Sequence, residues 1–136
     1  MTMTTIAPPR PAAIPGLPVR LTASPAAVAE ARRQVRAALD LWRAPVDPDI
    51  AVLLASDLVT NAIRHQLGGT ITLGVRCTPG GLRVDVHGSV DVHGAIGPDL
   101  ILVRTLSDEW GCYSTPAGQA VYFTLEAQRD GGDECP

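Results

Sequence analysis

Apolar and polar residues repeat in two different rhythms along this chain, and the rhythm changes near residue 69. Up to that point, apolar side chains recur at three- and four-residue steps, which is typical of helices that bury one face. The steps predict one helix from Ser24-Pro25 to about Trp42 and a second from Asp47-Pro48 to Gly68-Gly69. Each predicted helix starts with a serine or aspartate that can cap it, followed by a proline suited to the first turn.

Beyond residue 69, apolar residues alternate with polar ones, which is typical of strands with one covered face. Ile71, Leu73 and Val75 show this alternation most clearly. The pattern predicts a mixed, mostly antiparallel sheet with helices on one face, an α/β (α+β) two-layer sandwich. The expected strands are 17–21, 70–77, 82–86, 110–114 and 119–125, with a helical segment at 99–109.

One domain, at residues 17–126, contains all of these elements. The chain has 136 residues and is 46% hydrophobic, which is enough for a normal core. Residues 1–16 hold four prolines and few large apolar side chains, and residues 127–136 are polar. We therefore expect a disordered N-terminal arm and a disordered tail.

Composition excludes several classes of function. The sequence shows no apolar run long enough to span a membrane and no leader, so we expect a soluble, cytoplasmic protein without a membrane partner. A net charge of −3 and the lack of a basic cluster argue against nucleic acid as a partner. The chain contains no lysine, which excludes Schiff-base and P-loop lysine chemistry.

The three cysteines follow no metal-ligand spacing. Cys77 and Cys112 fall within predicted strands, where we expect them to be small buried apolar residues. Cys135 lies in the polar tail, where we expect an exposed free thiol. No catalytic role is assigned to any of the three.

Asp57, Asn61 and His65 stand four residues apart in the second predicted helix, so they share one helix face. Polar residues at this spacing usually form a solvated face. Asparagine, however, is a poor residue for a helix interior, because its amide competes with the backbone for hydrogen bonds. A carboxylate, an amide and an imidazole in one column therefore also fit a small polar site.

The run Asp-Leu-Val-Thr-Asn-Ala-Ile-Arg-His at 57–65 closely resembles the N box of the GHKL ATPases, in particular that of the anti-sigma-factor serine kinases. Residues 100–111 resemble the helix and following strand of the same family. The resemblance implies a Bergerat ATP-binding fold with ATP and Mg²⁺ as cofactors. It gives Asn61 the role of magnesium ligand and Asp57 that of general base, and it places His65 in the nucleotide site. The family usually has glutamate at the position of Asp57, so the base here reaches less far.

Two departures from the family concern the rest of its nucleotide site. Where relatives carry an aspartate that accepts a hydrogen bond from the adenine amine, this chain has His87 or Gly88. Gly97 matches the first glycine of the family's phosphate-binding element, but Asp99 stands at the second. A carboxylate there would repel phosphate, and a lost adenine contact costs roughly 1–3 kcal/mol. These departures predict weakened or lost ATP binding.

A short repeat, Val-Asp-Val-His-Gly, occupies 84–88 and again 90–94. Its two histidines, His87 and His93, raise the hypothesis of a metal site. Such a site needs a third and a fourth ligand, and no cysteine or glutamate nearby supplies one.

Three functional interpretations follow. The first is a regulatory protein of the anti-sigma-factor kinase type that has weakened or lost ATP binding and acts by protein–protein association. Its partner would be a sigma factor or an anti-sigma antagonist, and the family commonly forms homodimers. The alternative is an active ATP- and Mg²⁺-dependent serine/threonine kinase. The third is a small metal-binding protein that uses His87 and His93.

Overall fold

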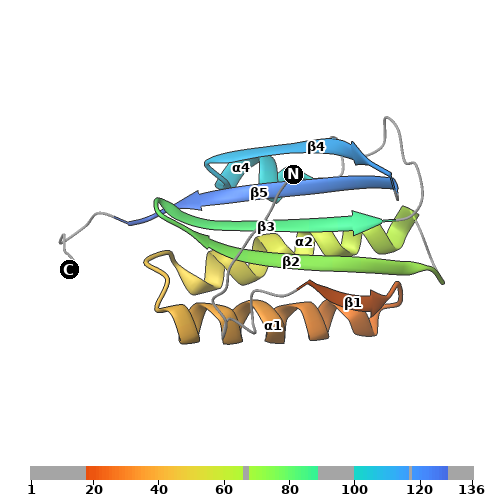
Figure 1. Cartoon of the computed structure of the whole chain (residues 1–136), viewed down its shortest axis with the longest axis horizontal. Coiled ribbons are helices and arrows are strands. Elements are labelled where there is room, and N and C mark those ends of the chain that lie inside the picture. Colours follow the sequence, from red (N-terminus) through yellow and green to blue (C-terminus); the bar gives the residue numbers. More distant parts are fainter. Residues whose placement is uncertain (1–17, 66–67, 89–99, 117, 129–136) are drawn as a thin grey trace.

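The structure is a computed structural model that describes residues 18–65, 68–88, 100–116 and 118–128 (Figure 1). The arm expected at 1–16 lies outside these ranges, and so do residues 129–136 of the expected tail. None of the helices within the described ranges is long and apolar enough to cross a membrane.

A five-stranded antiparallel sheet, in the order β1-β2-β3-β5-β4, forms one layer of the described part of the chain. Thr78 pairs with Gly81 where β2 meets β3, and Thr115 pairs with Gly118 where β4 meets β5, so both hairpins lie where the sequence predicted. The predicted two-layer sandwich is confirmed. The strands are β1 (Val19–Thr22), β2 (Thr70–Thr78), β3 (Gly81–Gly88), β4 (Glu109–Thr115) and β5 (Gly118–Glu126).

Helices α1 (Ala26–Trp42) and α2 (Pro48–His65) lie side by side on one face of the sheet, and the short α4 (Ile101–Leu106) lies beside β4 (Figure 1). The core between the two layers is made of fully buried side chains from both. Val35, Leu54 and Leu58 come from the helices, and they belong to one cluster with Leu73, Val84 and Phe123 of the sheet. The opposite face of the sheet carries no helix in the described residues.

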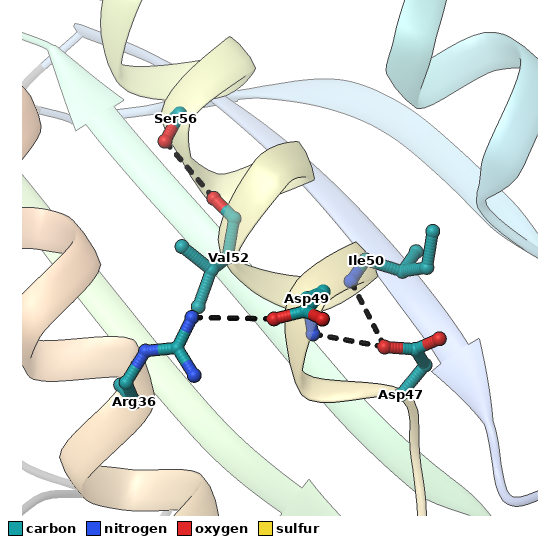
Figure 2. Close-up of polar contacts among 6 residues, drawn as sticks. All are labelled: Arg36, Asp47, Asp49, Ile50, Val52 and Ser56. Carbon is teal, nitrogen blue, oxygen red and sulfur yellow. Dashed lines mark hydrogen bonds and ion pairs between the residues drawn. The ribbon is translucent and has the colours of Figure 1, made fainter.

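The predicted start of α2 is confirmed. Oδ1 of Asp47 accepts the backbone N–H groups of Asp49 and Ile50, at 2.9 and 3.3 Å (Figure 2). These are two of the amides that a helix N-terminus leaves without a partner inside the helix. Figure 2 also shows Arg36 of α1 reaching Asp49, at 3.4 Å, so an exposed ion pair links the two helices.

The predicted cap of α1 is wrong. Pro25, whose φ and ψ are helical as expected of a proline in the first turn, takes the N-cap position, and no side chain caps the helix. The carbonyl of Ser24 accepts the N–H of Ala27 at 2.9 Å, so this residue closes the first turn through its backbone.

Helix α4 is shorter than the predicted 99–109. Ser107 is in an extended conformation, which ends the helix. Asp108 is already tied to β5, because its N–H donates to the carbonyl of Thr124 and its carboxylate accepts the N–H of Glu126. Asp108, which could have continued the helix, is therefore held by hydrogen bonds to β5 instead.

The expected burial of Cys77 and Cys112 is wrong, since both are exposed free thiols. Cys77 lies beyond the stretch of β2 that pairs with β1. Cys112 lies in β4, which is an edge strand in the described part of the chain. Their exposure depends on the position of each strand in the sheet. Cys135 lies outside the described residues.

Candidate nucleotide site

The polar column of α2 lies partly inside the protein. Asn61 is buried, with 4% of its surface exposed, while Asp57 and His65 are half-buried. A solvated helix face therefore does not describe Asn61. The column belongs to an otherwise apolar helix whose buried side chains include Leu54, Leu58 and Ile63.

Asp57 connects α2 to α4. Its Oδ2 accepts the N–H of Val103 at 3.2 Å, in the first turn of the short helix. The carboxylate thus satisfies an amide that the helix itself leaves without a partner. A negative charge at this end also suits the helix dipole. The carboxylate expected to act as a base therefore also holds α4 in place.

Asn61 has an unusual environment. Its Oδ1 is buried and has no hydrogen-bond partner. A buried acceptor without a partner costs roughly 1–3 kcal/mol, so native proteins rarely keep one without a function. An amide oxygen is a ligand that Mg²⁺ accepts. The oxygen therefore fits the metal role that the sequence suggested for it.

His87 and Gly88, the two candidates for adenine recognition at the end of β3, lie on opposite faces of the sheet. Side chains alternate along a strand, and Val84 and Val86 point into the core. His87 therefore lies on the face opposite the helices, where its Nε2 is 3.4 Å from the Tyr113 hydroxyl and the two rings meet edge to face. Gly88 pairs with the buried Ile71 and takes a position on the helix side. The structure does not bring the His87 side chain to Asn61.

Several residues from the sequence analysis lie outside the described ranges. They include Gly97, Asp99, His93 and the second copy of the repeat, at 90–94. Within the described ranges, no group of three or more His, Cys, Asp or Glu side chains is placed to hold a metal ion.

Sequence reasoning missed a polar network on the face of the sheet that the helices leave open. Asp85 is buried, with 8% of its surface exposed, and binds Arg83 through two hydrogen bonds of 2.9 and 3.0 Å. It also accepts the hydroxyl of Tyr113 at 2.6 Å. The guanidinium of Arg83 in turn stacks over the ring of Tyr122, 4.0 Å from its centroid.

The network shifts the pKa values of its members in opposite directions. Burial raises the pKa of Asp85, but the hydrogen bonds from Arg83 and Tyr113 outweigh it, so the net pKa lies below its usual value. For Tyr113, burial and the bond to Asp85 both disfavour the phenolate and raise its pKa to about 12. Asp85 is therefore a paired carboxylate with a structural role. The polar alternation of Arg83, Asp85 and His87 was visible in the sequence, but their partners on β4 and β5 were not.

Comparisons with known proteins support the fold. No protein-family model and no curated protein matches the chain. Among solved structures, it is similar to the RsbU and RsbW domains of Rv1364c from Mycobacterium tuberculosis, with 20% sequence identity and a TM-score of 0.56. The similarity covers 82% of this chain and 32% of that one, so the chain spans about a third of the length of that structure. At this identity, the similarity shows a shared fold.

Proposed function

We propose that this chain is a regulatory protein of the anti-sigma-factor serine kinase type. Its ATP binding is weak, and it regulates by protein–protein association. The proposal is supported by the N-box residues on α2, the helix and sheet layers, and the structural similarity to a protein that contains an RsbW domain. The partner would be another regulatory protein, either a sigma factor or an anti-sigma antagonist.

The observation that carries the proposal is the buried Asn61 oxygen without a partner. In the proposed site, this oxygen would hold Mg²⁺, and the ion would supply positive charge to offset the phosphates of ATP. Asp57, one helical turn away, would accept a proton from a partner hydroxyl, while its Oδ2 also accepts the N–H of Val103.

Weak nucleotide binding is expected from the end of β3. Gly88, on the helix side, has no side chain to accept the adenine amine, and His87 lies across the sheet. If this contact and one phosphate contact are each worth about 1.4 kcal/mol, their loss weakens binding roughly a hundredfold.

Calorimetric titration with Mg²⁺-ATP tests the proposal, and the strand end offers a matched pair of variants. Gly88→Asp places a carboxylate on the helix side and should strengthen ATP binding. His87→Asp places the same group on the other face and should not. Asn61→Ala should abolish the magnesium dependence of any residual binding.

Low-micromolar ATP binding by the unmodified chain would contradict the proposal that the nucleotide site is weakened. If such binding came with transfer of labelled phosphate to a partner serine, the alternative of an active kinase would replace the proposal. Equal effects of Gly88→Asp and His87→Asp would remove the end of β3 from the nucleotide site.

A further inference from the structure

A pocket of about 220 Å³ opens where the start of α2 meets the end of β5, at the opposite end of α2 from Asn61. Its walls are apolar, since Val46 and Leu125 are buried and Ile50 is half-buried. Carboxylates stand among these apolar side chains. The other residues that line the pocket are Asp47, Asp108, Glu126 and Gln128.

None of the three carboxylates forms an ion pair with a residue in the described part of the chain. Asp47 and Asp108 each accept backbone N–H groups, and Glu126 is exposed at the end of β5. Carboxylates that lie close together without a cation repel one another, and a cationic group between them relieves the repulsion. The charge of the pocket therefore favours a cationic ligand over a neutral or acidic one.

An apolar strip leads from this pocket along α2 and α4. The two helices are joined by the bond between Asp57 and Val103, and Asp108, directly after α4, lines the pocket at the start of α2. Leu53 of α2 and Leu106 of α4 lie between these two points, and they are 41% and 40% exposed. The strip thus continues the apolar walls of the pocket over the surface of both helices.

Helix α4 exposes more apolar surface than a short surface helix needs. Ile101 and Leu102 are exposed by 65% and 38%, and only Val103 of this helix is buried. A group of exposed apolar side chains with a polar border is typical of a protein-binding surface. We call Leu53, Leu102 and Leu106 the α2–α4 surface.

Apolar side chains beside an acidic pocket are complementary to a helix with an apolar face and a basic end. Apolar residues at three- and four-residue steps of such a helix would cover the exposed leucines. An arginine at its end would enter the pocket, where its methylene stem packs against the apolar walls and its guanidinium reaches the carboxylates.

We propose that the α2–α4 surface and the acidic pocket form a docking site for a basic amphipathic helix of a partner protein. The inference rests on the protein–protein association proposed above, because it assigns a surface to it. It uses neither the nucleotide site nor the arginines of α1.

Fluorescence anisotropy with a labelled synthetic peptide tests the docking site. The peptide forms a helix with leucines along one face and arginines in its last turn. It should bind the full chain, and its affinity should fall as the salt concentration rises, because salt screens the exposed carboxylates. A peptide with glutamates in place of the arginines should not bind.

Two matched pairs of variants locate the binding surface. Glu126→Arg should weaken binding of the basic peptide about tenfold or more, whereas Glu30→Arg makes the same charge change on α1 and should not. Leu106→Ser should also weaken binding about tenfold, whereas Leu41→Ser, at a leucine of α1 that is 57% exposed, should not. All four side chains lie at the surface, so each variant should keep the unfolding temperature of the parent chain.

Failure of the parent chain to bind the basic peptide, equal binding of the acidic peptide, or equal effects within either pair of variants would each overturn the proposal. If Leu106→Ser dissociates a dimer in sedimentation and leaves peptide binding unchanged, the surface belongs to a second copy and the proposal is wrong. If the peptide does not bind but a regulatory partner is still captured through α1, this docking site is excluded and the proposed function stands.

Discussion

The unpaired oxygen of Asn61 lowers the stability of the folded chain, and a bound ligand or partner would explain why the residue is kept. Its oxygen lies inside the protein without a hydrogen bond, although leucine, of similar shape, could fill the position. We expect Asn61→Leu to raise the free energy of unfolding by roughly 1 kcal/mol, because it removes the buried polar group. Urea denaturation measures the change. A loss of stability instead would mean that the amide has a native partner and is structural.

Tyr113 provides a pH-dependent contribution to stability whose sign can be derived. Its pKa in the folded chain, about 12, is above the ordinary value of 10.0, so its contribution is complete below pH 10 and is lost as the pH rises through 12. Tyr122→Phe leaves Tyr113 as the only tyrosine of the chain. Its ultraviolet titration should give a pKa near 12, and a value near 10 would show that the phenol is neither buried nor bonded to Asp85 in solution.

Asp85 makes a pH-dependent contribution to stability at the acidic end of the pH scale. Because its folded pKa is depressed, its contribution is present above the unfolded value of about 3.9 and is lost as the pH falls through the folded value. Tyr113→Phe removes a hydrogen bond to this carboxylate, so the variant should lose less stability than the parent chain on acidification.

At the scale of elements, the two long helices start differently, and this difference can be measured. Asp47→Ala removes a side-chain cap from α2 and should lower the free energy of unfolding by about 1 kcal/mol. Ser24→Ala removes a side chain that makes no capping bond in α1 and should change it by less than about 0.5 kcal/mol. Equal losses in urea denaturation would contradict this assignment.

The success of the sequence predictions follows from which interactions are local. Helical steps, strand alternation and turn residues act over a few positions, so α1, α2 and both hairpins could be placed within a residue or two. The end of α4 and the exposure of Cys112 depend on which strands become neighbours. That information is not local, and the sequence pattern did not contain it.

In the candidate site, too, the features set by residues close in sequence could be predicted, and those set by distant residues could not. The common face of Asp57 and Asn61 followed from helical spacing alone. The bond from Asp57 to Val103 joins residues 46 positions apart, which no pattern in the sequence could give. The side of the sheet that His87 takes was predictable, since it alternates with the apolar Val84 and Val86.

At the scale of the whole molecule, the exposed arginines of α1 offer a surface for a partner. Arg33 pairs with Glu30 and Arg36 with Asp49, but the side chains stay 68% and 51% exposed, so these pairs contribute little to stability. Charge reversal at Arg32, Arg33 and Arg36 should weaken capture of an acidic partner by lowering the rate of association. Reversal at Arg76, exposed on β2, is the control. Unchanged capture in a pull-down would exclude α1 from the interface.

The strand order also determines how the chain must fold. The pairs β2–β3 and β4–β5 are hairpins that close over a few residues, and α1 and α2 are likewise neighbours in sequence. Pairing of β3 with β5 instead joins residues as distant as Gly81 and Glu126, so it closes a long loop at an entropic cost. The two hairpins should therefore form early and their docking should limit the folding rate. Core substitutions at Val84 or Phe123, where the hairpins meet, should slow folding more than substitutions within either turn.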